Sequence, residues 1–133
     1  MKLSYAERAR ALVGARFRAQ GRGKDGLDCV GLVLLTFDFD AVEIRKNYRL
    51  RGDHLSEIEH GLLHQFRRIA RRDIRSGDVM LMRVADDQLH LGVRTRDGFV
   101  HAHAGIGSVV ETPGAPEWPV LGVYRKRVRK RDD

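Results

Sequence analysis

The chain lacks several features that would place it in a specialised class of protein. It has one cysteine, Cys29, which excludes an internal disulfide framework and a thiolate-rich zinc site. No apolar run approaches the roughly 20 residues of a membrane span, and the longest, residues 30–35, fits a buried helix or strand. Residues 1–4 have no apolar signal core, so we expect that the protein is not exported by the secretory route on its own.

Aromatic residues are also scarce, at 7% of the chain, whereas positive charge is abundant. Lys and Arg number 25 against 18 Asp and Glu, for a formal net charge of +7, and part of this excess falls in an expected basic tail at about residues 125–133. Such charge favours anionic surroundings, namely nucleic acid, phosphate-rich envelope polymers or an acidic protein. A solvated basic face explains it equally well. Since no aromatic stacking motif accompanies the basic residues, specific nucleic-acid recognition is not expected.

The remaining pattern is that of a single domain, residues 1–133, with helices first and strands afterwards. Capping boxes at residues 4–7 and 56–59, with apolar residues at helical spacing, contribute to three predicted helices: residues 4–14, 28–37 and 56–72. Alternating segments predict strands at residues 79–84, 89–95, 98–103, 108–111 and 120–126. Residues 16–26 and 38–54 are expected to be loops. This order indicates an α+β fold.

Cys29 requires local support before it is considered reactive, because a single cysteine is more often a buried, inert side chain. Asp28 is the predicted N-cap of the second helix, which makes Cys29 the first helical residue. The helix dipole and the free amides at that position stabilise a thiolate, and papain-like enzymes activate their nucleophile in this way. The placement by itself leaves both interpretations open.

A thiol nucleophile requires a base, and six histidines are available. His90, His101 and His103 fall on a predicted hairpin that turns near Asp97-Gly98. Because strand side chains alternate, His90 lies opposite His103 or diagonal to His101. A base oriented by a second polar residue follows the logic of a catalytic triad. A metal site built from these three histidines is the less favoured interpretation.

Elsewhere, His60 and His64 lie four residues apart on the third predicted helix without an evident third ligand. We therefore expect no metal and no other cofactor.

Four sequence blocks, in order and together spanning most of the chain, resemble the signature of NlpC-type cysteine peptidases. They are residues 14–17 (Gly-Ala-Arg-Phe) with Gly21, residues 26–33 (Gly-Leu-Asp-Cys-Val-Gly-Leu-Val), residues 74–79 (Ile-Arg-Ser-Gly-Asp-Val), and residues 90–93 (His-Leu-Gly-Val) with 100–102 (Val-His-Ala). The resemblance implies a papain-like fold in which N-terminal helices pack on a C-terminal antiparallel sheet.

By this resemblance Cys29 is the nucleophile, His90 the general base and His101 the residue that orients the base. The residues implied beside the oxyanion and the substrate are Phe17, Asp28, Val30 and His103. The backbone amide of Cys29 is a natural oxyanion donor.

The chain also departs from the family pattern at three positions. Phe17 stands where many members have tyrosine, Val30 where they have serine, and Arg16 where they have proline. Two supporting hydroxyls are thus missing, which predicts a slower enzyme. The stretch Arg-Ala-Gln-Gly-Arg at residues 18–22 is most similar to the phage-type branch, whose members are encoded with tail genes.

The resemblance implies a cysteine peptidase that hydrolyses amide bonds of peptidoglycan stem peptides through an acyl-enzyme. We expect it to be made in the host cytoplasm and carried on a phage or phage-like tail, with tail-hub proteins as partners, to open the wall during DNA delivery. The alternative is a structural tail-tip component with the same fold and little or no catalysis. A third interpretation, a basic nucleic-acid-binding protein, rests on charge alone.

Overall fold

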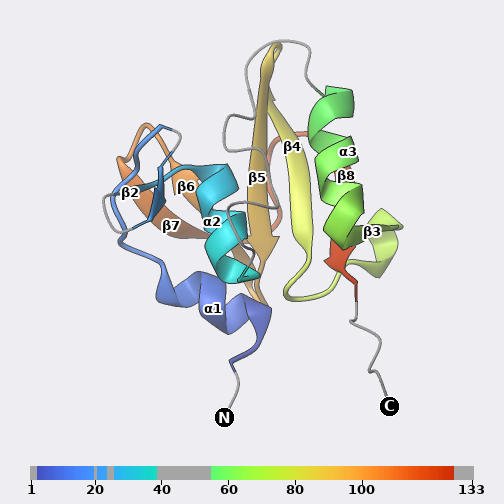
Figure 1. Ribbon diagram of the computed structural model, residues 1–133, viewed down its shortest axis with the longest axis horizontal. Helices are drawn as coiled ribbons and strands as arrows, with labels where there is room; N and C mark the ends of the chain where they lie inside the picture. Colours follow the sequence, from blue (N-terminus) through green and yellow to red (C-terminus); the bar gives the residue numbers. More distant parts are fainter. Residues whose placement is uncertain (1–2, 20, 24–25, 39–54, 128–133) are drawn as a thin grey trace.

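The computed structural model describes residues 3–19, 21–23, 26–38 and 55–127, and its helices lie against a single large sheet (Figure 1). The helices are α1 (Tyr5–Ala11), α2 (Cys29–Thr36) and α3 (Leu55–Gln65), with a 3-10 turn at Arg71–Asp73. The strands are β1 (Arg22–Gly23), β2 (Gly26–Leu27), β3 (Phe66–Ile69), β4 (Val79–Ala85), β5 (Gln88–Arg94), β6 (Gly98–His103), β7 (Ser108–Pro113) and β8 (Val120–Lys126). Helices first and strands afterwards confirm the predicted α+β class.

Six of the strands form one antiparallel sheet in the order β3-β8-β4-β5-β6-β7, and β1 and β2 form a separate small hairpin. Helix α2 packs on β5 and β6, whereas α3 packs on β3 and β8. The helices therefore cover the two ends of the sheet separately, as Figure 1 shows for α2 and α3.

Strand register decides which side chains share a face of this sheet. Leu81 is paired with Leu91, and both belong to the main core beneath the helices. Met82 is paired with His90, so both point to the opposite face. A second, smaller cluster forms there around Met80, Met82 and Phe99, covered by Ile74, Trp118 and Val120.

The first two helices begin where the sequence predicts. Ser4 and Glu7 make both hydrogen bonds of a capping box, which confirms the start of α1. Helix α2 starts at Cys29 after its N-cap Asp28, and all of its residues except Leu35 are buried. A helix that is apolar nearly all round gains stability mainly by burial, at about 25 cal/mol per Å² of apolar surface.

The third helix is shorter than predicted. Helix α3 begins at Leu55, so Ser56 lies inside its first turn and the predicted N-cap is wrong. It also ends at Gln65 instead of residue 72, because residues 66–69 pair with β8 as an edge strand. Phe66 and Ile69 have the spacing of a helix face, but here they lie on opposite faces of β3 and each is buried.

Three other segments bear on the predicted loops and tail. The expected loop 16–26 contains the small hairpin of β1 and β2, which corrects that prediction. The predicted loop 38–54 lies outside the described residues except for Asp38. Strand β8 continues to Lys126, so the first basic residues of the C-terminal segment belong to the sheet.

Within the described parts of the chain, none of the helices has the length and apolar character that a membrane crossing requires.

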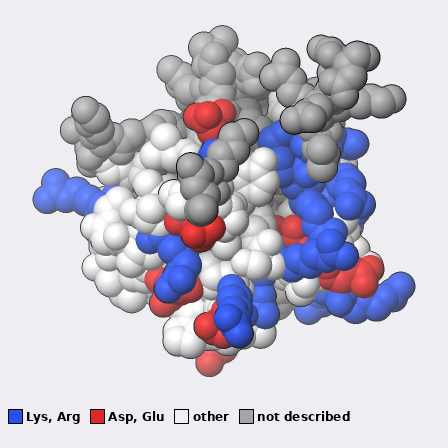
Figure 2. Space-filling view, turned by 90° about the horizontal axis from the view of Figure 1, so that it is seen from below, with Lys and Arg blue, Asp and Glu red and all other residues white. Residues whose placement is uncertain are grey.

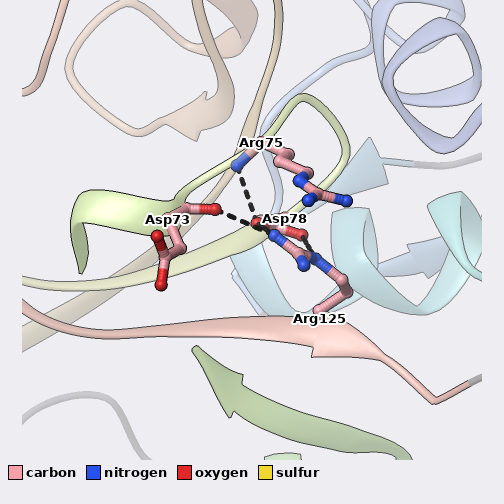
Figure 3. Close-up of polar contacts among 4 residues, drawn as sticks. All are labelled: Asp73, Arg75, Asp78 and Arg125. Carbon is pink, nitrogen blue, oxygen red and sulfur yellow. Dashed lines mark hydrogen bonds and ion pairs between the residues drawn. The ribbon is translucent and has the colours of Figure 1, made fainter. Parts of the chain in front are cut away.

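The turn that leads into β4 is closed around the buried carboxylate of Asp78 (Figure 3). Its Oδ2 accepts the backbone N–H of Arg75 at 2.8 Å. The guanidinium of Arg125 on β8 donates to both carboxylate oxygens, at 2.9 and 2.8 Å, and to the carbonyl of Asp73 at 3.0 Å. This bidentate contact fixes the end of β8 against the start of β4.

Candidate active site

Cys29 occupies the position that the sequence predicts, the first residue of α2. The Asp28 carboxylate accepts the backbone N–H of Gly31 at 2.9 Å and so caps the helix. The thiol-bearing residue is 2% exposed. The first turn is also closely approached by the preceding loop, because a Cβ at Gly31 would lie 2.1 Å from the carbonyl oxygen of Gly21. Glycine is therefore required at position 31.

The structure joins two of the three hairpin histidines. His90 Nε2 lies 2.8 Å from His101 Nδ1, with the ring planes at 80°. Strands β5 and β6 pair through Val93–Val100 and Arg94–Phe99. Continued along the strands, that register places His103 opposite His90, so His101 is the diagonal neighbour. Of the two arrangements that alternation left open, the diagonal contact is the one that carries the hydrogen bond.

The hydrogen-bonded chain continues to a residue that sequence reasoning missed. His101 Nε2 lies 2.8 Å from Thr112 Oγ1 on β7. Register pairs Phe99 with Thr112 and His101 with Val110, which puts the threonine on the same face as the histidines. The predicted strand stopped at residue 111, and only the pairing of β6 with β7 brings this hydroxyl to the imidazole. We call His90, His101 and Thr112 the histidine cluster.

Burial dominates the electrostatics of this cluster. It lowers the pKa of His90 to about 3, helped by the neighbouring charges of His101 and then His103. It lowers the pKa of His101 to about 4, with His103 adding to the effect. Both imidazoles are therefore neutral at neutral pH, and the direction of their hydrogen bonds depends on which ring nitrogen carries the proton.

Two aromatic side chains, Trp118 and Phe99, pack against the histidines of the cluster. The Trp118 ring meets the rings of His90 and His101 edge-on, each at 5.7 Å between centroids. Phe99 lies 4.6 Å from the His101 ring. Trp118 is in an irregular segment before β8 and has no sequence signal of its own, because the chain around it carries no recognisable motif.

The other predicted site residues have more local contacts. His103 Nδ1 accepts the backbone N–H of Ile106 at 3.0 Å and thereby closes the turn after β6. The backbone N–H of Phe17 donates to the Gly107 carbonyl at 2.9 Å, which ties the loop before α2 to the same turn. Val30 is 5% exposed and belongs to the main core.

Metal chemistry has no obvious set of ligands among the described residues. His60 and His64 lie on α3 with their ring centroids 5.0 Å apart. Within the described ranges, no three or more His, Cys, Asp or Glu side chains gather in a way that could hold a metal ion. The histidine cluster instead forms a hydrogen-bonded chain across β5, β6 and β7, and α2, which begins with Cys29, packs on β5 and β6.

Comparisons with known proteins show which family the chain resembles. The model of the NlpC/P60 family covers residues 14–118. The murein DD-endopeptidase MepS/murein LD-carboxypeptidase of Escherichia coli strain K12 is 28% identical over 119 residues, which is 89% of this chain and 58% of that protein. The same protein from strain O157:H7 matches equally. The chain thus spans little more than half the length of these relatives.

Solved structures show the same fold at low identity. NlpC1 from Trichomonas vaginalis superposes with a TM-score of 0.69 and 20% identity over 94% of this chain and 44% of its own. The peptidoglycan hydrolase RipB from Mycobacterium tuberculosis superposes with a TM-score of 0.59 and 21% identity, over 95% of this chain and 64% of its own. The P60 domain of antigen MAP1204 from M. avium subspecies paratuberculosis superposes with a TM-score of 0.58 and 19% identity, over 92% of this chain and 90% of its own. Together they establish the papain-like α+β architecture.

Proposed function

Because the chain belongs to the NlpC/P60 family, we propose that it is a peptidoglycan hydrolase that cleaves an amide bond of a stem peptide with Cys29 as the nucleophile. The relatives whose names describe murein endopeptidase and peptidoglycan hydrolase activity support the substrate class. The observation that carries the proposal is the chain of two 2.8 Å hydrogen bonds from His90 through His101 to Thr112, on strands next to α2.

The proposed reaction uses the nitrogen of His90 that the cluster leaves available. His90 Nδ1 takes the proton of the Cys29 thiol as the sulfur attacks the scissile carbonyl carbon, and the backbone amide of Cys29 stabilises the oxyanion. The imidazolium returns that proton to the leaving amine, and a thioester remains. Water then gives a proton to His90 and its hydroxide to the acyl carbon. The C–S bond breaks, and the imidazolium returns the proton to the leaving sulfur, which releases the acid and restores the thiol and the neutral base.

In this reaction Thr112 is a positioning residue. For Nδ1 of His90 to accept a proton, the ring proton of His90 must sit on Nε2 and donate to His101 Nδ1. The proton of His101 then sits on Nε2 and donates to the Thr112 hydroxyl oxygen. The Thr112 hydroxyl, as the acceptor at the far end of the cluster, thus supports this tautomer of both imidazoles. His101 serves as the orienting residue between them.

Muropeptide release from purified sacculi tests the proposal. The intact protein should release soluble fragments, whereas Cys29→Ala, with an unchanged circular dichroism spectrum, should release none above background. His60→Ala, at an exposed histidine of α3, is the matched control and should retain full activity. If Cys29→Ala releases the same products as the intact protein, the nucleophile is wrong. If neither protein releases any, a structural role with this fold becomes the better interpretation.

The place of action that we propose is a phage or phage-like tail, with tail-hub proteins as partners. This rests on the similarity of residues 18–22 to the phage-type branch. Mass spectrometry of purified particles from cells that produce the chain should find it at a fixed ratio to tail proteins. Its absence from intact particles would rule this setting out and leave the hydrolase proposal untouched.

A further inference from the structure

Exposed arginines gather at the β3 edge of the sheet, far from the proposed nucleophile. We call them the arginine edge: Arg67, Arg71, Arg72, Arg75 and Arg127. The first four follow one another through β3, the 3-10 turn and the entry to β4, and Arg127 comes after β8, the neighbour of β3. In Figure 2 basic side chains crowd the side of the molecule that corresponds to β3 and α3 in Figure 1.

Most of this charge is not neutralised by the described part of the protein. Nearby Arg68 pairs with Glu59 at 2.6 Å, and Arg125 pairs with Asp78 (Figure 3). No described carboxylate forms an ion pair with any side chain of the arginine edge. Over residues 66–77 the sole acidic residue is Asp73. Two basic side chains of this region therefore serve the fold, and Arg127 also donates to the Leu63 carbonyl at 3.4 Å. The other members of the arginine edge are exposed and form no ion pair with a described carboxylate.

The charges of the arginine edge exceed what the fold uses. Arg67 and Arg125 are direct register partners, and Asp78 offsets the charge of Arg125 but not that of Arg67. Charge on an edge strand does prevent unwanted strand pairing. That protection needs charges on β3 alone, whereas the arginines continue through the 3-10 turn to Arg75, beyond the strand.

One member of the arginine edge, Arg67, lies on the sheet face that bears the histidine cluster. Register places Arg67 with Arg125, Val123 with Met80, and Met82 with His90 on one face. Arg67 and His90 are three strands apart across the sheet and several residues apart along the strand direction. The usual spacing between strands and rise per residue then put them about 20 Å apart. A peptide would need about six extended residues to reach both. A small substrate therefore cannot contact the two regions together, but a polymer can.

We propose that the arginine edge is an anchoring surface for the carboxylates of peptidoglycan stem peptides other than the one being cleaved. This rests on the proposed function for the identity of the polymer. Guanidinium groups bind carboxylates in bidentate fashion, and peptidoglycan repeats its carboxylates along the network. A single-stranded nucleic acid is the less suitable partner, because no aromatic side chain for base stacking lies among residues 67–75.

Binding without cleavage tests the anchoring surface. In a Cys29→Ala background, sedimentation with purified sacculi should show that Arg67→Gln/Arg71→Gln/Arg72→Gln lowers affinity about tenfold, since each exposed contact is worth under 1 kcal/mol. The matched control, Arg8→Gln/Arg83→Gln/Arg96→Gln, removes the same charge elsewhere and should lower affinity less than threefold. The single variant Arg71→Gln, in the 3-10 turn outside the sheet, should lose about twofold and guards against misfolding of the triple variant.

Three results would overturn the anchoring surface. The first is an equal loss in the edge and control triples, which indicates general charge. The second is undiminished binding to sacculi whose carboxylates have been converted to neutral amides. The third is DNA that binds while sacculi do not. A protein that binds sacculi through the arginine edge but never cleaves them would instead overturn the proposed function and leave the anchoring surface standing.

Discussion

The histidine cluster and the arginine edge belong to one sheet but place positive charge in opposite environments, and Arg67 shares a sheet face with His90. Around His90 and His101, burial beside Trp118 and Phe99 holds the pKa of both imidazoles far below 6.5, so they stay neutral. At the arginine edge, the guanidinium groups are exposed to water. The first environment suits proton transfer, and the second suits recognition of an anion. The comparison predicts large effects on rate from the cluster and small effects on affinity from the edge.

The largest effect is expected from His90→Ala. Loss of the base should lower kcat/KM for a soluble stem-peptide fragment by at least about 1,000-fold, because a unit of nucleophile and base acts as a whole. Stopped assays with product detection by chromatography measure the loss. His64→Ala provides the matched histidine control, with no expected change. A residual activity within tenfold of the intact protein would remove His90 from the reaction.

Thr112→Val should have the next largest effect, on the order of 10- to 100-fold in kcat with little change in KM, since the hydroxyl positions the imidazoles without contacting substrate. Thr112→Ser keeps the oxygen and should restore most of the activity. Nitrogen NMR of the histidine rings provides a readout independent of turnover: the proton of His101 should reside on Nε2 in the intact protein and partly on Nδ1 in Thr112→Val. An unchanged tautomer would contradict the positioning role.

Acid sensitivity should separate the two regions as well. The folded-state pKa values of His90 and His101, about 3 and 4, lie below the unfolded value of 6.5, so the unfolded chain binds more protons between these limits. The free energy of unfolding should therefore fall as the pH drops from 6.5 toward 3. Urea midpoints across that range should decline less in His101→Gln than in the intact protein. Replacement of Arg71 by Gln should leave the decline unchanged, because guanidinium does not titrate there.

Salt should give the smallest effect and act on the arginine edge alone. Raising the ionic strength from 0.05 to about 0.3 M should weaken sacculus binding of Cys29→Ala severalfold, since exposed charges are screened within about 10 Å. Turnover of a small soluble fragment by the intact protein should change less than twofold over the same range. Equal salt dependence in the two assays would show that the two regions are not separate.

Local sequence was enough to place the thiol and most of the elements. The Asp28 cap and the apolar run of α2 are local signals, and the strands from β4 to β8 appear as alternating patterns in the sequence. The structure confirms these elements, with β7 extending two residues beyond its predicted end at 111. Edge strand β3 could not be predicted, because Phe66 and Ile69 fit a helix face equally well until β8 is there to pair with them.

The sequence by itself determined which reactive groups the protein has: one thiol at a helix start, histidines at alternating strand positions and an excess of arginine. Strand alternation alone could not choose between His101 and His103, and the tertiary structure does so, because β5 and β6 meet in a register that makes the diagonal contact the bonded one. Pairing of β6 with β7 likewise brought Thr112 to the cluster, and pairing of β3 with β8 gathered the arginines. These choices depend on contacts between distant segments, which local pattern does not encode.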